Sequence, residues 1–413
     1  MTQEFWAERY TSLLPRITAY AHGTPLILCG LASCADAYLR LAQAQALFAA
    51  APGTEPNALA QELIRRTERG LGGEFFMPWP DGGSWIENNL PVASWGLGGT
   101  GAQAAQTLAI LGGRALISLE DRSERKLSVI HPDVLVADSS GLRRRGELSS
   151  RPGSEPVHYI FEVAAGDQVG PIKASRSTRI IVRFAHHHLD RDADFVRVSQ
   201  ESASTAGAAV VCGFNELADE SLREELEDAR RLLSAWRESG LALVHLELGG
   251  YESIAARDQV LSVLGPVITS LGMSHTELRG FGEHDVVKQA SRFAEEFDLR
   301  RVCVHADHWA LTVTRDEVEA ELESLLCGCL LASCRADSGA PRVPTRIPAA
   351  ARFSPPNWPL VHRSENRSIV CCAAPYLERP MATIGLGDTF LAGTLLVLGN
   401  SLGAHSLSSF TLR

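Results

Sequence analysis

The stretch that does most to decide this fold is Ala382-Thr383-Ile384-Gly385-Leu386-Gly387-Asp388-Thr389-Phe390. Its two glycines let the backbone approach a ligand closely, and the apolar run that follows predicts a helix. Free amides at the start of that helix, together with its dipole, would hold developing negative charge. Asp388 would lie beside them, placed to take a proton from a hydroxyl that attacks a phosphoryl group. The motif alone also fits a loop in which Asp388 only caps the helix.

The composition is that of an ordinary globular protein. The chain has 413 residues, of which 45% are hydrophobic and 21% charged, and its net charge is −10. This acidity argues against binding to nucleic acid or to a membrane surface. The sequence contains no run of about 18 apolar residues, so no membrane span is predicted. The N-terminal residues do not form a basic segment followed by an apolar one, and most of the nine cysteines lie in apolar runs. We therefore expect reduced thiols and a cytoplasmic location.

Strand-like and helix-like segments alternate regularly in the second half of the chain. Strands are predicted at 209–212, 241–246, 267–271 and 301–305, and each is followed by a helix, the last of them at 315–334. This alternation predicts an α/β fold, a doubly wound and mostly parallel sheet with helices on both faces.

The first half contains pieces that are richer in strand signals. A buried strand at 25–30 is followed by a predicted helix at 34–50, and segment 55–97 is rich in glycine, proline and tryptophan. Further strand-like pieces lie within 120–206. We expect residues 1–413 to form one unit, in which segments 55–97 and 120–206 build a smaller β-rich lid on the large α/β domain.

Polar side chains follow several of the predicted strands. Phosphoryl transfer needs carboxylates to hold Mg²⁺, and cations or amides to hold phosphate oxygens. In a doubly wound sheet, ligands bind at the carboxyl ends of the strands. The candidates at these positions are Asn215, His245, Glu247, Glu277 and His305. One carboxylate could be an ordinary surface charge, but several at successive strand ends predict a site.

Together these residues resemble the ADP-dependent glucokinase and phosphofructokinase family, a branch of the ribokinase-like kinases. The most specific match is residues 379–389, Arg-Pro-Met-Ala-Thr-Ile-Gly-Leu-Gly-Asp-Thr, where the family reads roughly N-P-V-S-T-V-G-L-G-D-T. Residues 245–247 match an H-x-E motif, residues 274–277 are similar to N-x-x-E, and residues 98–101 to G-G-N-A. The other matches are residues 33–37 with N-x-D-A, 159–162 with W-I-F-E and 176–180 with R-x-x-R-F.

The resemblance implies a role for each matched residue. Asp388 would be the base that activates the acceptor hydroxyl, and the amides of Gly385, Leu386 and Gly387 would surround the transferred phosphoryl group. Glu247 and Glu277 would hold Mg²⁺, largely through water. The residues implied at the nucleotide are Arg179, His305 and Thr383, and those implied at the acceptor are Asp36, Gly98, Gly99, Thr100 and Asn215.

The implied reaction transfers a phosphoryl group from ADP, giving AMP, to a hydroxyl of a sugar, a sugar phosphate or a similar acceptor. Ser274 and Thr100 each replace a family asparagine, and residues 31–36 lack the usual asparagines. We therefore expect an acceptor other than glucose or fructose 6-phosphate. An acceptor that carries its own phosphate would need a cationic pocket, and the candidates for it are Lys173, Arg176 and Arg183.

Two other functions remain open. The same fold could use ATP, because the G-x-G-D motif is common to both branches of the superfamily. A sugar- or nucleotide-binding protein without turnover is the second alternative. The resemblance also implies a monomer, in which the lid closes over the acceptor and excludes water.

Overall fold

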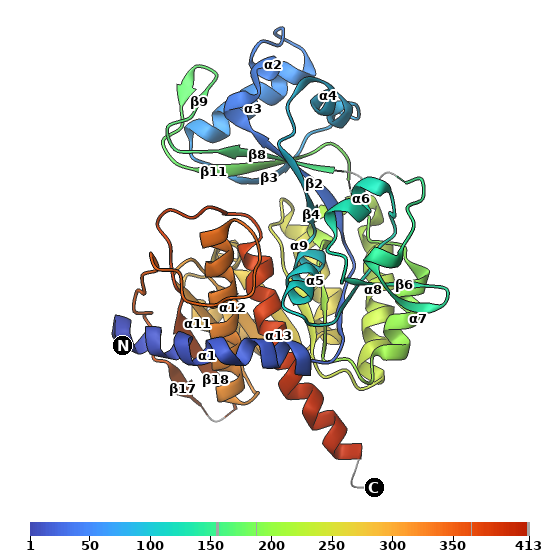
Figure 1. Ribbon diagram of the computed structural model, residues 1–413, viewed down its shortest axis with the longest axis vertical. Helices are drawn as coiled ribbons and strands as arrows, with labels where there is room; N and C mark the ends of the chain where they lie inside the picture. The colour runs from blue at the N-terminus through green and yellow to red at the C-terminus, as the bar shows by residue number, and fades with distance from the viewer. Residues whose placement is uncertain (154–156, 187, 365, 411–413) are drawn as a thin grey trace.

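The computed structural model describes residues 1–153, 157–186, 188–364 and 366–410, which form a large and a small domain (Figure 1). The large domain contains an eleven-stranded sheet in the order β17-β18-β16-β15-β14-β13-β12-β1-β5-β6-β7. The strands from β15 to β6 in this order are parallel, and the antiparallel ones lie at the two ends of the sheet. The strands are β1 (Ile27–Cys29), β5 (Ala115–Ile117), β6 (Leu135–Asp138), β7 (Gly141–Arg144), β12 (Ala208–Val211), β13 (Val244–Glu247), β14 (Ser270–Ser274), β15 (Arg301–His305), β16 (Trp309–Thr314), β17 (Val361–Arg363) and β18 (Ser368–Ala373).

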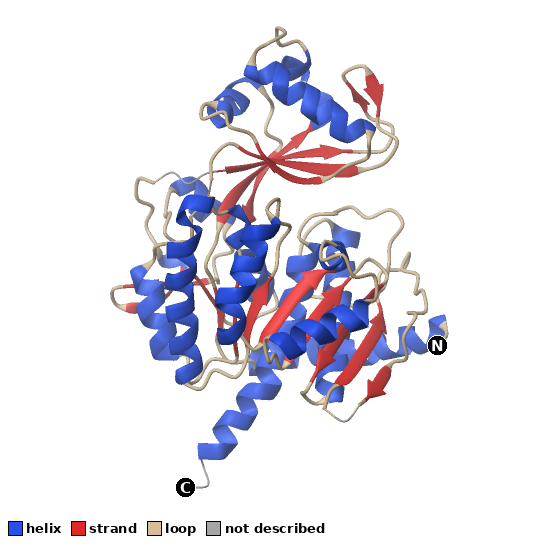
Figure 2. Ribbon diagram, turned by 180° about the vertical axis from the view of Figure 1, so that it is seen from behind, coloured by secondary structure: helices blue, strands red, loops and turns tan. Residues whose placement is uncertain are grey.

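Helices cover both faces of this sheet (Figure 2). The hydrophobic core on one face includes α1 (Gln3–Gly23), α5 (Thr100–Ile110), α6 (Glu124–Val129), α12 (Val318–Ser338) and α13 (Leu386–Phe410). The core on the other face includes α7 (Ala193–Ser202), α8 (Asp219–Glu238), α9 (Ile254–Leu264), α10 (His275–Arg279) and α11 (Val286–Glu296). Short 3-10 turns are η2 (Arg145–Glu147), η3 (Phe214–Glu216) and η4 (Gly265–Val267). The predicted doubly wound, mostly parallel α/β fold is confirmed.

The small domain is a five-stranded sheet with its own hydrophobic core. Its strands, in spatial order, are β3 (Gly73–Phe76), β11 (Thr178–Arg183), β8 (Val157–Val163), β2 (Cys34–Arg40) and β4 (Ser94–Gly98). Three helices pack on it, together with a turn and a hairpin: α2 (Gln45–Phe48), α3 (Glu55–Glu68), α4 (Gly82–Asn89), η1 (Leu41–Gln43), β9 (Gln168–Val169) and β10 (Ile172–Lys173). Figure 1 shows this sheet above the large domain, where β4 contacts α5.

Two expectations about these elements are wrong, and a third is incomplete. Residues 34–40 form a strand of the small sheet, not the start of a helix, because they pair with both β4 and β8. The lid segment expected at 120–206 includes β6 and β7, which belong to the large sheet, while β2 lies outside both expected lid segments. The helix expected at 315–334 is present as Val318–Ser338, but the antiparallel strand β16 before it was not predicted from the sequence.

All nine cysteines are buried and free, as the sequence predicts. Cys34 is the one that lies in the small domain, on β2. Across the described part of the chain, we find no helix with the length and apolar character that crossing a bilayer requires.

Candidate active site

The turn before α13 forms the centre of the candidate site. Gly385 has a φ of +70°, in the left-handed region that favours glycine, and α13 begins at the next residue. Arg335 of α12 is largely buried and donates to the Gly385 carbonyl and to the Thr389 hydroxyl, each at 3.0 Å. A Cβ at position 385 would overlap this guanidinium, so packing also requires glycine. The amides of the first turn have no carbonyl partner within the helix, which leaves them able to bind an anion.

Asp388 lies in this first turn, where several groups act on its carboxyl. Burial raises the pKa of Asp388, whereas the charges of Arg335 and Arg179 and a hydrogen bond from the Thr100 hydroxyl lower it. Thr100 is the first residue of α5, which packs against α13. The net pKa of Asp388 lies above its ordinary value, because burial outweighs the two cations and the hydroxyl. The carboxylate form, which these three groups favour, can accept a proton.

Asp36 approaches the same region from β2 of the small domain. The charge of Arg335 interacts with those of both Asp388 and Asp36. Gly98 lies opposite Cys34 in the pairing of β2 with β4, and a Cβ at position 98 would overlap the Asp36 carboxylate. The next residue, Gly99, has a φ of +88° and leads directly into α5. The structure therefore brings Asp36, Gly98, Thr100 and Asp388, which are distant in the sequence, into one group.

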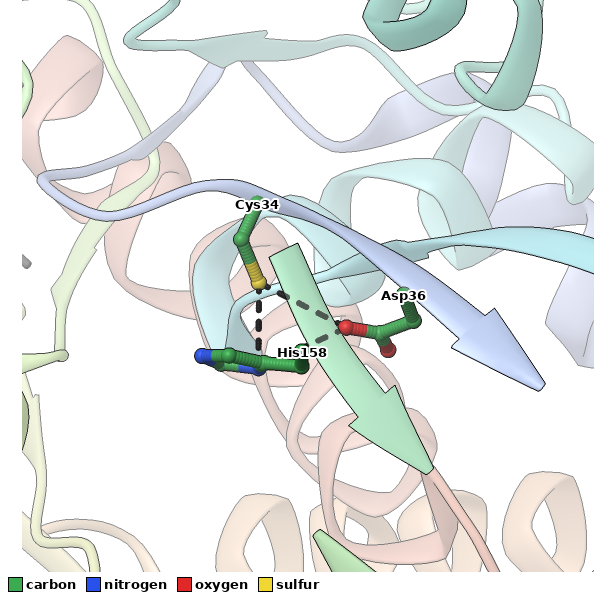
Figure 3. Close-up of side chains that lie close together, drawn as sticks. All are labelled: Cys34, Asp36 and His158. Atoms are coloured by element: carbon green, nitrogen blue, oxygen red, sulfur yellow. Dashed lines mark hydrogen bonds and ion pairs between the residues drawn. The ribbon is translucent and has the colours of Figure 1, made fainter. Parts of the chain in front are cut away.

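Cys34 and His158 complete the surroundings of Asp36, as Figure 3 shows. The Cys34 Sγ lies 3.3 Å from His158 Nδ1 and 3.5 Å from Asp36 Oδ1, and His158 Nδ1 lies 3.4 Å from the same carboxylate oxygen. On its other side, His158 Nε2 lies 3.3 Å from Glu216 Oε2. Burial alone would lower the pKa of His158, but its acidic neighbours raise it well above its ordinary value.

A second group of charged side chains lies at the carboxyl ends of β13, β14 and β15. Glu247 Oε2 contacts His245 Nε2 at 2.9 Å, and Glu247 Oε1 contacts His305 Nε2 at 3.4 Å. Burial would raise the pKa of Glu247, but contacts with the two histidines hold it at about 2. His245 also contacts Ser270 at 2.7 Å and is 1% exposed, so its ring is held between Ser270 and Glu247.

Glu277 lies in α10, which follows β14. It forms a capping box with Ser274, in which the Ser274 amide donates to Glu277 Oε2 at 2.7 Å and the Glu277 amide to Ser274 Oγ at 3.2 Å. Burial and the charge of Glu247 raise the pKa of Glu277 to about 7. A cation near both carboxylates would relieve this repulsion, and carboxylate oxygens are the ligands that Mg²⁺ takes. The two residues therefore fit a magnesium site.

His305 links this second group to the turn before α13. A Cβ at Gly387 would come 3.3 Å from His305 Cε1, and the His305 and Phe390 ring centroids are 5.0 Å apart. Burial lowers the pKa of His305, but Glu247, Glu277 and Asp388 raise it more, so its net pKa lies above the ordinary value. His305 can thus bring positive charge between the carboxylates and the anion-binding turn.

The remaining predicted residues lie at two other places. Arg179 of β11 donates to the Thr383 carbonyl, which joins the small domain to the turn before α13. Asn215, in η3, lies against Gly249 in the segment after β13, where a Cβ on the glycine would be 2.8 Å from the Asn215 side-chain carbon.

Sequence reasoning missed four charged residues of this site. Arg335 holds the Gly385 turn. The one feature of the sequence that could have identified it is an arginine among mostly apolar residues in the long helix that precedes residues 385–388. His158, Glu74 and Glu216 meet near Asp36, with Glu74 paired to Arg183. They come from three separate elements and have no common sequence motif, so only the fold brings them together.

The site thus combines a carboxylate at an anion-binding helix start with further carboxylates at neighbouring strand ends of a doubly wound sheet. Solved structures agree on the fold: an ADP-dependent kinase in complex with fructose-6-phosphate and ADPβS has a TM-score of 0.81, 17% sequence identity, and coverage of 97% of this chain and 99% of that one. The chain belongs to the ADP-specific phosphofructokinase/glucokinase family, whose conserved region matches residues 27–397.

Two curated relatives are similar in sequence. The chain is 23% identical over 372 residues to the ADP-specific phosphofructokinase of Thermococcus litoralis, which covers 75% of this chain and 78% of that protein. It is also 23% identical over 270 residues to the ADP-dependent glucose/glucosamine kinase of Pyrococcus abyssi. That second match spans 56% of this chain and 59% of the relative's length.

Proposed function

We propose that the protein is an ADP-dependent kinase that phosphorylates a hydroxyl of a sugar-like acceptor, with Asp388 as the base. The observation that carries this proposal is the position of Asp388. It lies in the first turn of α13, hydrogen-bonded to Thr100 and interacting with the charges of Arg335 and Arg179. A carboxylate here can accept a proton within reach of amides that bind the transferred group.

The reaction follows from these positions. The acceptor hydroxyl gives its proton to Asp388 while its oxygen attacks the β-phosphorus of ADP. The bond between that phosphorus and the bridging oxygen breaks, and AMP leaves with the bonding electrons. The amides of Gly385, Leu386 and Gly387 stabilise the charge on the phosphoryl oxygens during transfer.

Glu247 and Glu277 would hold Mg²⁺ in this scheme. When bound, the ion supplies positive charge that neutralises phosphate oxygens as negative charge moves onto the leaving group. His245 orients Glu247 by its 2.9 Å contact, and the Ser274 amide orients Glu277 at 2.7 Å. Arg179, His305 and Thr383 are proposed at the nucleotide, because Arg179 reaches the Thr383 carbonyl and His305 lies beside Gly387.

The acceptor end of the site favours an uncharged, hydroxyl-rich molecule. Asp36, Glu74 and Glu216 bring three carboxylates close to His158. Arg183, one of the cations that could hold a phosphate, is paired with Glu74 and also donates to the Glu216 carbonyl at 3.3 Å. Carboxylates accept hydrogen bonds from hydroxyls but repel a phosphate dianion. We therefore propose that Asp36, Gly98, Gly99 and Thr100 bind a non-phosphorylated polyol, with Asn215 near its outer end.

The test is phosphoryl transfer with Mg²⁺, using ADP and ATP separately against sugars, sugar phosphates and nucleosides. We expect AMP to form from ADP only when an uncharged acceptor is present, and to fall to background in Asp388→Asn. Turnover with ATP alone would contradict the donor, and preference for a sugar phosphate would contradict the acceptor. Acceptor or nucleotide binding without turnover across the panel would favour a binding protein instead.

The small domain would act as a lid in this scheme. It contributes Asp36 and Arg179, whereas Asp388 and the metal-binding carboxylates come from the large domain. Closure of the small domain onto the large one would complete the site and exclude water from the donor. We propose that one chain is sufficient for this closure, as a monomer in the cytoplasm.

A further inference from the structure

We propose that Cys34, Asp36 and His158 form a binding site for a thiophilic divalent cation such as Zn²⁺. The three side chains belong to two neighbouring strands, β2 and β8, and are 2%, 3% and 6% exposed. Figure 3 shows the sulfur, a ring nitrogen and a carboxylate oxygen turned toward one another. A thiol, an imidazole and a carboxylate are the three ligand types that zinc takes in proteins.

The distances match one face of a zinc tetrahedron. The three ligand atoms form a triangle with sides of 3.3, 3.4 and 3.5 Å. Zinc holds sulfur at about 2.3 Å and nitrogen or oxygen at about 2.0–2.2 Å, so tetrahedral ligands lie roughly 3.3–3.6 Å apart. The ligand atoms therefore already lie at the separations that a bound ion requires, and the fourth position is left for water.

The outer contacts of His158 fit the same assignment. A zinc-bound histidine normally donates its other ring N–H to a carboxylate, a backbone carbonyl or water, which fixes the tautomer and turns the ligating nitrogen to the metal. His158 Nε2 lies 3.3 Å from Glu216 Oε2, and Nδ1 faces the Cys34 sulfur and the Asp36 oxygen. Gly98 lies beside two of the ligands, since a Cβ there would overlap both the Asp36 carboxylate and the Cys34 sulfur.

The sulfur ligand distinguishes this site from the proposed magnesium site. Mg²⁺ prefers oxygen ligands, whereas a thiolate selects softer ions such as Zn²⁺. All three ligands lie on the small domain and Glu216 on the large one, so separation of the domains would give an ion access.

Occupation of this site would affect the proposed kinase, because Asp36 is also the proposed acceptor ligand. On that proposed function, Zn²⁺ is expected to inhibit transfer in competition with the acceptor. The metal site itself does not depend on the proposed kinase function, so direct measurements of metal binding test the site even if no phosphoryl transfer is found.

The test uses the full chain, titrated with Zn²⁺ by calorimetry and with Co²⁺ by absorption spectroscopy. We expect one ion per chain and, with Co²⁺, a thiolate charge-transfer band together with the intense visible bands of a tetrahedral site. Cys34→Asn, which introduces the family's asparagine, should lose the charge-transfer band. Glu216→Gln should weaken Zn²⁺ binding about 10- to 100-fold, as loss of a histidine's outer carboxylate does.

Cys371→Ala is the matched control, because Cys371 is equally buried but lies on β18 of the large domain. It should bind both ions like the wild type. No tetrahedral cobalt spectrum in the wild type would overturn the proposal whatever the variants do. Zinc affinity unchanged in a folded Cys34→Asn would overturn it as well.

Discussion

At the scale of single residues, Asp388 and Arg335 depend on each other. Arg335 fixes the Gly385 turn through its 3.0 Å bond to the carbonyl, and its charge opposes the rise in the Asp388 pKa that burial causes. One side chain thus acts on both the shape of the turn before α13 and the protonation of Asp388, the proposed base.

Replacing Asp388 by Asn should lower kcat by about 10²- to 10⁴-fold, the usual contribution of a general base. The amide keeps the size and the contact with Thr100 but cannot accept the acceptor's proton. The measurement is AMP formed from ADP at saturating acceptor, with nucleotide affinity determined separately by calorimetry. A variant that keeps normal kcat would exclude Asp388 as the base.

Replacing Arg335 by Met should move the acid limb of the pH–activity profile to higher pH. Asp388 acts when ionised, so activity is lost as pH falls through its pKa, and removing a nearby positive charge raises that pKa. Arg335→Lys retains the charge and should shift the limb less than Met. Equal shifts in the two variants would mean that the charge of Arg335 does not act on the base.

At the scale of helices and strands, α12 and α13 cross where two glycines meet. A Cβ on Gly393 would come 2.7 Å from Gly328 Cα, a backbone atom that cannot move aside without shifting a helix. This close crossing holds α13, and therefore the position of Asp388 at its start.

Gly393→Ala should therefore lower the free energy of unfolding by about 1–3 kcal/mol, the usual cost of overpacking. Urea denaturation measures this loss. Gly250→Ala is the control, since a Cβ at position 250 has no heavy atom within 4 Å. Similar losses in both variants would show that the crossing is not tightly packed.

How far the sequence predicts these elements depends on how local their signals are. The strand at Arg301–His305 and the start of α13 are predictable because a buried apolar run and a glycine-rich turn identify them. Residues 34–40 were misread because Cys-Ala-Asp-Ala-Tyr-Leu continues into an alanine-rich segment, and only pairing with β4 and β8 makes them a strand. His158 and Arg335 were missed for a similar reason, since each acts on residues far away in the sequence.

At the scale of the whole molecule, Arg179 connects the small domain to the turn before α13. Its guanidinium donates to the Thr383 carbonyl, and its charge interacts with that of Asp388. A residue in this position can transmit the presence of nucleotide to the small domain.

Arg179→Met should raise KM for ADP about 10- to 100-fold, equivalent to the roughly 1.5–3 kcal/mol of a hydrogen bond to a charged group. Small-angle scattering gives the second readout: with a non-transferable ADP analogue and acceptor, the radius of gyration should fall in the wild type and fall less in the variant. If KM rises but compaction is unchanged, Arg179 binds the nucleotide without controlling the domains.

The buried cysteines provide the chain with internal reporters of how it opens. Cys34 lies in the small domain and the other eight are in the large one. A thiol-alkylating reagent should therefore modify Cys34 when the two domains separate, and the cysteines inside the core of the large domain only when that core opens. The alkylation rate of each cysteine would give the free energies of domain separation and of core opening in the wild-type protein, without an introduced probe.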